Sequence, residues 1–136
     1  MEGRLKARQV ANAANLSTLL GLGVAKLGGA RLSRGPDGLV LGHGYHRALP
    51  RAAAFTVGNV VLTKHPPGYL SNRSELLRHE ARHADQWACW VGLPFLLAYA
   101  VAVGWSFLRT GTPALGNAFE RRAGLVDGGY LPRRPD

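Results

Sequence analysis

The longest uncharged run in the chain constrains its fold more than any other feature. It begins after Asp85, and its apolar part extends from Trp87 to Leu108. About 20 apolar residues in one helix are enough to cross a lipid bilayer. However, Gly92 and Pro94 lie inside the run, and such residues are typical of the end of one helix and the start of another. The run therefore predicts either one spanning helix or two shorter ones.

The segment immediately before this run has the spacing of a metal-binding helix. It reads His79-Glu80-Ala81-Arg82-His83. Residues four apart lie one helical turn apart on the same face, so the two imidazoles can share one zinc ion. Glu80 lies about 100° further around the helix, beside the metal. There it can take a proton from zinc-bound water without being a ligand.

The residues around the motif predict a helix with two distinct faces. Asn72 followed three residues later by Glu75 is typical of a capping box, so we expect a helix from about Arg73 to Trp90 or Val91. Helical winding at about 100° per residue separates a polar stripe from an aliphatic one. The polar stripe contains Glu75, His79, His83, Gln86 and Trp90, and the opposite stripe contains Leu77, Ala81, Ala84, Ala88 and Val91.

Two short β-branched segments precede the helix, at Leu39–Leu41 and Phe55–Leu62. We expect two strands joined through residues 45–54, after a stretch of turns from Gly28 to Gly38. Gly58 inside the second segment predicts a bulge or a close backbone approach, as in an edge strand that holds an extended peptide. The fold class predicted is α+β and mostly helical.

Charge and the N-terminal segment favour a lipid partner. Seventeen Lys and Arg against eight Asp and Glu give a formal net charge of +9. No aromatic-interleaved RNA motif or DNA-reading helix occurs, so we expect no nucleic-acid partner. After a basic start, Val10–Leu27 is weakly apolar and predicts a helix at a membrane interface. The single cysteine, Cys89, excludes an internal disulfide and is compatible with a reducing compartment. We expect membrane association at the cytoplasmic face.

In the motif and its flanks the sequence resembles the zincin superfamily, in particular the compact gluzincins, whose third ligand is a Glu on a later helix. The resemblance extends from Phe55 to about Gly124. It implies a mini-zincin with a short β-hairpin or edge strand beside the substrate cleft, then the HExxH helix, then an apolar helical hairpin. By the same resemblance, Asn117-x-x-Glu120 corresponds to the glutamate-bearing helix, and Glu120 is the third ligand.

Other residues compete for this role. Asn117 and Glu120 are also spaced as a capping box, which would occupy the carboxylate. Asp127 is the second choice, because some zincins use an aspartate, and Tyr130 near it could steady an oxyanion. The remaining histidines could also supply nitrogen ligands, and His65 directly follows the predicted edge strand. The other two histidines are His43 and His46.

The third ligand constrains the apolar run. One straight helix through it would be about 30 Å long and would place Glu120 across a bilayer from His83. Zinc requires bonds of about 2 Å, so a site with Glu120 requires the run to turn back at Gly92–Pro94. The hairpin so formed would be a core element or would enter one leaflet of a membrane.

The sequence thus predicts one metallopeptidase-like domain. It would have an N-terminal membrane-interface helix in residues 1–30, a zincin-like core in 38–124 and a C-terminal tail in 125–136. Zn²⁺ held by His79, His83 and Glu120, with Glu80 activating the zinc-bound water, would hydrolyse a peptide or protein substrate at a lipid membrane. The alternative is a non-catalytic zinc-binding or pseudo-enzyme membrane protein with a basic lipid-binding surface.

Overall fold

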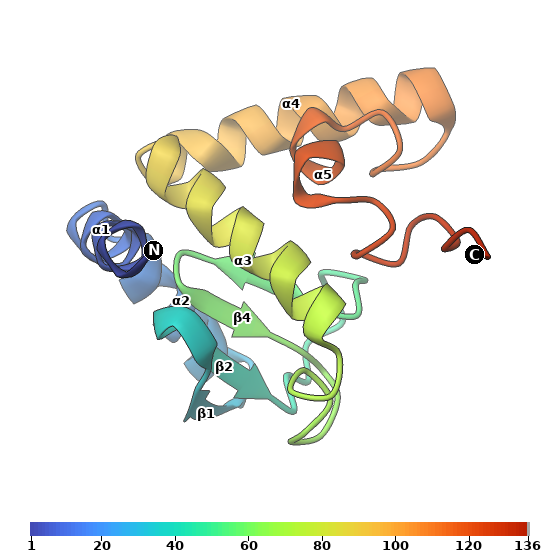
Figure 1. Ribbon diagram of the computed structural model, residues 1–136. Coiled ribbons are helices and arrows are strands. Elements are labelled where there is room, and N and C mark those ends of the chain that lie inside the picture. The colour runs from blue at the N-terminus through green and yellow to red at the C-terminus, as the bar shows by residue number, and fades with distance from the viewer. Residues whose placement is uncertain (136) are drawn as a thin grey trace.

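The computed structural model describes residues 1–135, which form five α-helices and a four-stranded sheet (Figure 1). The predicted α+β, mostly helical class is confirmed. The helices are α1 (Glu2–Ala14), α2 (Ser17–Leu27), α3 (Ser74–Cys89), α4 (Leu93–Thr110) and α5 (Ala118–Ala123). The strands are β1 (Arg31–Arg34), β2 (Val40–His43), β3 (Phe55–Val57) and β4 (Val60–Leu62), and a 3₁₀ turn, η1, covers Pro36–Gly38.

The sheet is mixed, and β3 lies at its edge. The strand order is β1-β2-β4-β3, with β2 and β4 parallel and the other two pairs antiparallel. Val57 pairs with Val60, so the predicted strand Phe55–Leu62 is a hairpin of two strands with a two-residue turn. Gly58 takes the first turn position with φ 62°, where glycine is favoured because L-residues are strained there. The turn replaces the predicted bulge, whereas the predicted close backbone approach is confirmed, because a Cβ on Gly58 would clash with the backbone nitrogen of Thr18.

Helices cover the two faces of the sheet, and the alternation along β4 explains why. Val60 and Leu62 pack with Ala25 of α2 on one face. Val61 belongs to the cluster on the other face, which includes Leu77 of α3. Successive side chains of a strand point to opposite faces, so this short apolar strand serves both layers.

The N-terminal region differs from its prediction. Instead of one helix over Val10–Leu27 there are two, separated at Leu16, which has φ 66°. α1 packs on α3 through Asn12, whose buried amide donates to Asn59 Oδ1 at 2.8 Å and to the Ala84 carbonyl at 2.9 Å. A buried amide with two partners ties α1 to both the hairpin turn and the motif helix. The first thirty residues therefore pack onto the core.

The stretch predicted as turns, Gly28 to Gly38, contains β1 as well as η1. All four residues of β1 are exposed. A strand with no buried side chain has no hydrophobic alternation, so its sequence carries no strand signal.

The uncharged run is broken where the sequence predicts. α3 ends at Cys89 and α4 begins at Leu93, with positive φ at Val91 (58°) and Gly92 (82°). α4 turns back but diverges from α3, and α5 lies in the angle between them (Figure 1). By length and composition α4 could cross a membrane, yet only 11% of this helix is buried. It is therefore not a core helix.

Candidate metal centre

α3 carries both motif histidines on its inward side. His79 is 2% exposed and His83 is 7% exposed. The predicted Asn72 cap is wrong, because the N-cap residue is Arg73 and no side chain caps the helix. Packing of the aliphatic stripe, with Leu77 in the core against the sheet, orients the helix instead. The imidazoles consequently face away from the sheet core, toward α5.

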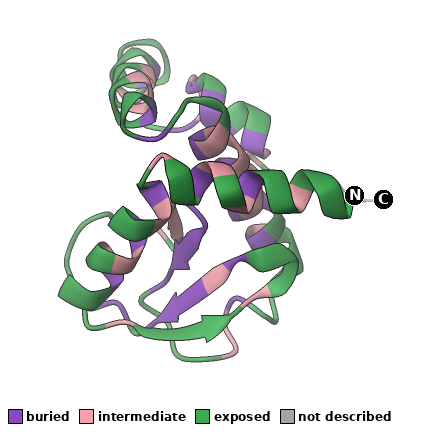
Figure 2. Ribbon diagram, turned by 90° about the vertical axis from the view of Figure 1, so that its left-hand side faces the viewer, coloured by how far each residue is buried: buried purple, intermediate pink, exposed green. Residues whose placement is uncertain are grey.

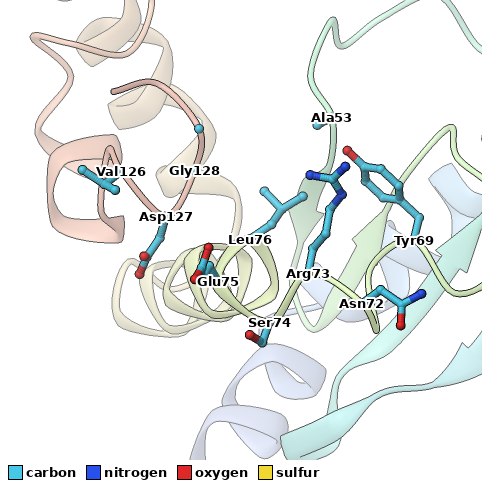
Figure 3. Close-up of a pocket in the computed structure, with 11 residues that line it drawn as sticks. Ala53, Tyr69, Asn72, Arg73, Ser74, Glu75, Leu76, Val126, Asp127 and Gly128 are labelled. Carbon is cyan, nitrogen blue, oxygen red and sulfur yellow. The ribbon is translucent and has the colours of Figure 1, made fainter. Parts of the chain in front are cut away.

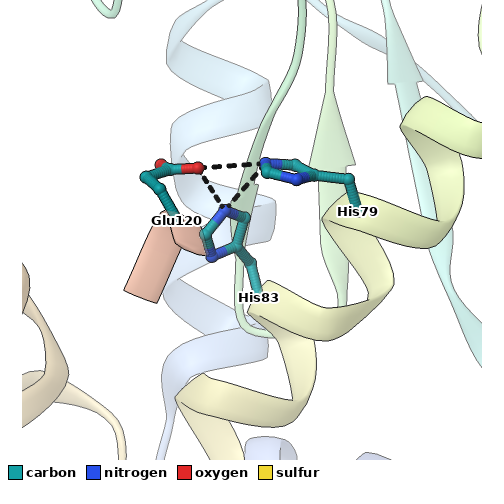
Figure 4. A group of neighbouring side chains, drawn as sticks. All are labelled: His79, His83 and Glu120. Carbon is teal, nitrogen blue, oxygen red and sulfur yellow. Dashed lines mark hydrogen bonds and ion pairs between the residues drawn. The ribbon is translucent and has the colours of Figure 1, made fainter. Parts of the chain in front are cut away.

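The sequence left open whether Glu120 completes a capping box with Asn117 or serves as a metal ligand. The Asn117 side chain caps α5, and its Oδ1 accepts hydrogen bonds from the backbone N–H groups of Phe119 (2.9 Å) and Glu120 (3.4 Å). The Glu120 carboxylate does not return to the cap, but points at the two imidazoles and is buried (Figure 4). The cap therefore fixes the start of the short helix that presents Glu120.

Three ligand-type atoms meet at one point (Figure 4). Glu120 Oε2 lies 3.1 Å from His79 Nε2 and 3.2 Å from His83 Nε2, and the two Nε2 atoms are 3.1 Å apart. Tetrahedral zinc with bonds of about 2.0–2.1 Å holds its ligand atoms about 3.3–3.4 Å apart. The triangle is therefore close to the size that one zinc ion requires.

Neighbouring acceptors orient both imidazoles. His79 Nδ1 lies 2.9 Å from the Gly124 carbonyl, and His83 Nδ1 lies 2.8 Å from Gln86 Oε1. The Gln86 amide is itself oriented, because its Nε2 donates to the Phe119 carbonyl at 2.9 Å. Carbonyl oxygens only accept, so each Nδ1 must carry the proton. Each Nε2 then presents its lone pair to the common point, as in protein zinc sites.

The electrostatics at this point favour a cation. Burial alone would raise the pKa of Glu120, but hydrogen bonds with His79 and His83 hold it well below its usual value. Burial alone would lower the pKa of His83, yet its hydrogen bond with Glu120 and the charge of Glu80 raise it. Without an ion these hydrogen bonds require a proton on an Nε2 atom, because lone pairs and a carboxylate converging without positive charge repel one another; a cation at the common point would take the place of that proton. The donor set fits zinc.

Glu80 lies beside this triangle and is held by the edge strand. Thr56 of β3 donates from its hydroxyl to Glu80 Oε2 at 2.5 Å. Burial raises the pKa of Glu80 despite the nearby imidazoles. The carboxylate is thus positioned next to, but not within, the group of three ligand atoms.

Tyr99 is a site residue that the sequence did not predict. Its hydroxyl donates to Glu120 Oε1, and its ring lines the same cavity. A weak signal for it exists, because Phe95, Tyr99 and Ser106 share the inner face of α4 at helical spacing. Tyr130 also lines the cavity, with its ring centroid 5.9 Å from that of His79. Burial and the charges of Glu120 and Glu80 raise the pKa of Tyr130.

The competing ligands lie elsewhere. Asp127 pairs with Arg82 at 3.1 Å and Arg78 at 3.6 Å, which makes it a partner of arginines. His65, which follows the edge-strand hairpin, is exposed and stacks on Tyr69 with ring centroids 3.8 Å apart, so this alternative ligand lies outside the cluster. His43 and His46 also lie outside the cluster; over residues 1–135 the group that could hold a metal consists of His79, His83 and Glu120.

Two of the cavities that border α3 are relevant to the site. The one that contains the cluster has a volume of about 340 Å³ and is otherwise walled largely by apolar side chains, including Phe55, Phe95 and Leu96. The other, about 690 Å³, lies at the N-terminal end of α3 (Figure 3). There Arg73 lies over the Tyr69 ring at 4.5 Å, and neither the histidines nor Glu80 reach it. The smaller cavity therefore contains the reactive groups.

Comparison of the chain with protein-family models, with curated proteins and with solved structures found no match in any of the three. The functional argument therefore rests on the geometry of the site.

Proposed function

We propose that the protein is a zinc-dependent, gluzincin-like metallopeptidase that hydrolyses peptide bonds. The observation that carries the proposal is the buried convergence of His79 Nε2, His83 Nε2 and Glu120 Oε2 within 3.2 Å of one another. Glu80, held by Thr56 at the rim of that group, supports a catalytic rather than a purely structural site.

The three convergent residues would hold the ion, and Glu80 would move the proton. Zinc, when bound, supplies a Lewis acid that polarises a carbonyl and acidifies water. Glu80 accepts the proton of the water that attacks the scissile carbonyl carbon. It then delivers that proton to the amine nitrogen as the C–N bond breaks. A carboxylate whose pKa is raised by burial is suited to both halves of this transfer.

Two tyrosines have distinct positions in this scheme. Tyr99 is a positioning residue, because it donates to the carboxylate oxygen of Glu120 that faces away from the imidazoles. Tyr130 lines the cavity near His79, and its raised pKa keeps its hydroxyl protonated. This hydroxyl can donate to the oxygen of the tetrahedral intermediate.

The first test is metal content. Purified wild-type protein should contain about one zinc per chain, and His79→Ala should contain almost none. His65→Ala is the matched control, because His65 is an exposed histidine outside the cluster. Equal zinc in the wild type and His79→Ala would refute the metal site.

The second test is catalysis by the zinc-loaded protein on a mixture of fluorogenic peptides. Glu80→Gln should keep its zinc and lose about 10²–10⁴-fold in rate, because the general base is removed. Glu75→Gln, an exposed carboxylate on the same helix, should keep the wild-type rate. A zinc-loaded wild type no faster than Glu80→Gln would instead favour the non-catalytic alternative.

A further inference from the structure

One side of α4 exposes apolar side chains along its whole length. Leu97 is 75% exposed, Val101 73% and Leu108 85%, and Leu93 lies on the same stripe. No charged residue occurs in this helix before Arg109 near its end. Figure 2 shows α4 at the upper left, viewed along its axis, with most of its ribbon exposed. Single exposed apolar residues are ordinary, but a continuous apolar face indicates a partner.

Two other segments add to this surface. On α2, Leu20 and Leu27 lie on one stripe and are exposed, with Leu19 beside them. The loop of residues 44–54 exposes Leu49. In Figure 2, α2 lies at the left below α4, so the two helices project toward the same side of the molecule.

These three segments each contribute side chains to the wall of the cavity that holds the candidate metal centre. Val24 comes from α2, Tyr45 and Pro50 from the loop, and Leu96 from α4, and all four line this cavity. The face that exposes apolar side chains therefore borders this cavity.

The charge on the same segments indicates what the face contacts. α2, the loop 44–54 and α4 contain no Asp or Glu. Their charged residues are Lys26, Arg47, Arg51 and Arg109, and Arg109 lies over the Trp105 ring at 4.7 Å. An apolar surface rimmed by basic and aromatic groups complements a bilayer with acidic headgroups.

α4 must lie along such a bilayer rather than cross it. Near its start Phe95 packs on Phe119 of α5, with ring centroids 5.1 Å apart. Near its end Ser106 donates to the Thr112 carbonyl at 2.6 Å. One side of the helix is thus covered by the protein at both ends, and α5 next to it exposes Arg121 and Arg122. A spanning orientation would place these arginines in hydrocarbon, at high cost.

We propose that the exposed faces of α2, α4 and the loop 44–54 dock the protein on an acidic lipid bilayer. The metal centre then opens toward the membrane surface, and its substrates are peptides anchored there. The substrate part rests on the proposed peptidase function, whereas the docking part does not.

Docking is tested by sedimentation with two kinds of vesicle. One contains phosphatidylcholine alone, and the other contains phosphatidylcholine with about 30 mol% phosphatidylglycerol. Wild-type protein should bind the acidic vesicles, and the emission of exposed Trp105 should shift to the blue. The double variant Leu97→Asp/Val101→Asp should bind about tenfold or more weakly. Leu32→Asp is the matched control, because Leu32 is exposed on β1 at the far edge of the sheet.

The docking proposal is overturned if wild type stays in the supernatant, or if the double variant binds as well as Leu32→Asp. It is also overturned if wild type sediments in buffer as a dimer that the double variant abolishes, with no vesicle binding, because a second copy then covers the face. Vesicle binding and the oligomeric state in buffer are also measured for zinc-loaded Glu80→Gln, which separates docking from catalysis.

Substrate presentation is tested with one peptide in two forms, free and N-terminally palmitoylated in acidic vesicles. Wild type should cleave the anchored form at least about tenfold faster, and the ratio should fall toward one in the double variant. Equal rates for the two forms in wild type would refute membrane presentation while leaving the peptidase function intact. Cleavage of neither form would refute the peptidase function, and vesicle binding would still decide docking.

Discussion

The candidate metal centre and the outer face of α4 depart from the usual distribution of side chains in opposite ways. At the centre, imidazole and carboxylate groups are buried, with Glu120 only 2% exposed. On α4, large aliphatic groups are exposed, with Leu97 75% exposed. Each departure costs free energy in an isolated chain, and each is removed by a partner of matching chemistry. The buried imidazole and carboxylate groups therefore indicate that the partner is a cation. The exposed aliphatic groups of α4 indicate that the partner is an apolar phase.

The largest expected effect is on the free energy of unfolding, and it distinguishes the inner face of α4 from the outer face. Phe95 is 3% exposed and packs on Trp87 and Phe119 with centroid distances of 5.0 and 5.1 Å. Phe95→Ala should therefore lower the free energy of unfolding by about 3–5 kcal/mol. Leu97→Ala, two residues away on the outer face, should change it by less than about 0.5 kcal/mol in lipid-free buffer. Urea unfolding followed by circular dichroism measures both.

Similar losses for the two variants would mean that the outer face is covered in solution. Such a result would remove the contrast between the inner and outer faces on which lipid docking depends.

The next largest effect is on zinc affinity, and it tests whether Glu120 or Asp127 is the third ligand. Glu120→Gln should weaken zinc binding by more than about a hundredfold, because loss of a direct ligand exceeds the ten- to hundredfold cost of losing an outer partner. Asp127→Asn should leave zinc affinity nearly unchanged, since Asp127 pairs with arginines rather than the imidazoles. Competition with a chromophoric chelator measures both affinities. The reverse order would exchange the roles of the two residues.

Local spacing made α3 and its polar stripe predictable, because the helical period alone places His79, His83 and Gln86 on one side. The same was true of the break at Gly92. In contrast, the packing of α1 onto α3 depends on Asn12 reaching Asn59 and Ala84, contacts across the fold that no local pattern records.

The position of the third ligand-type atom, Glu120 Oε2, also depends on contacts across the fold. Only the position of α5 in the angle between α3 and α4 decides that Glu120, and not Asp127, meets the imidazoles. The contribution of Tyr99 likewise requires α4 to turn back over α5, which the apolar run permits but does not specify.

The smallest expected effect tests whether hydrogen bonds from residues outside the three ligands orient those ligands. Gln86 accepts from His83 Nδ1 and donates to the Phe119 carbonyl, one residue before Glu120, so it connects two corners of the site. Gln86→Leu should weaken zinc binding about ten- to hundredfold, because the His83 ring loses the acceptor that sets its orientation and protonation. Gln86→Glu keeps an acceptor for Nδ1 and should recover most of this loss, although it cannot donate to Phe119. If both variants bind zinc as wild type does, backbone packing alone orients His83, and the hydrogen-bond argument for the lone-pair directions fails.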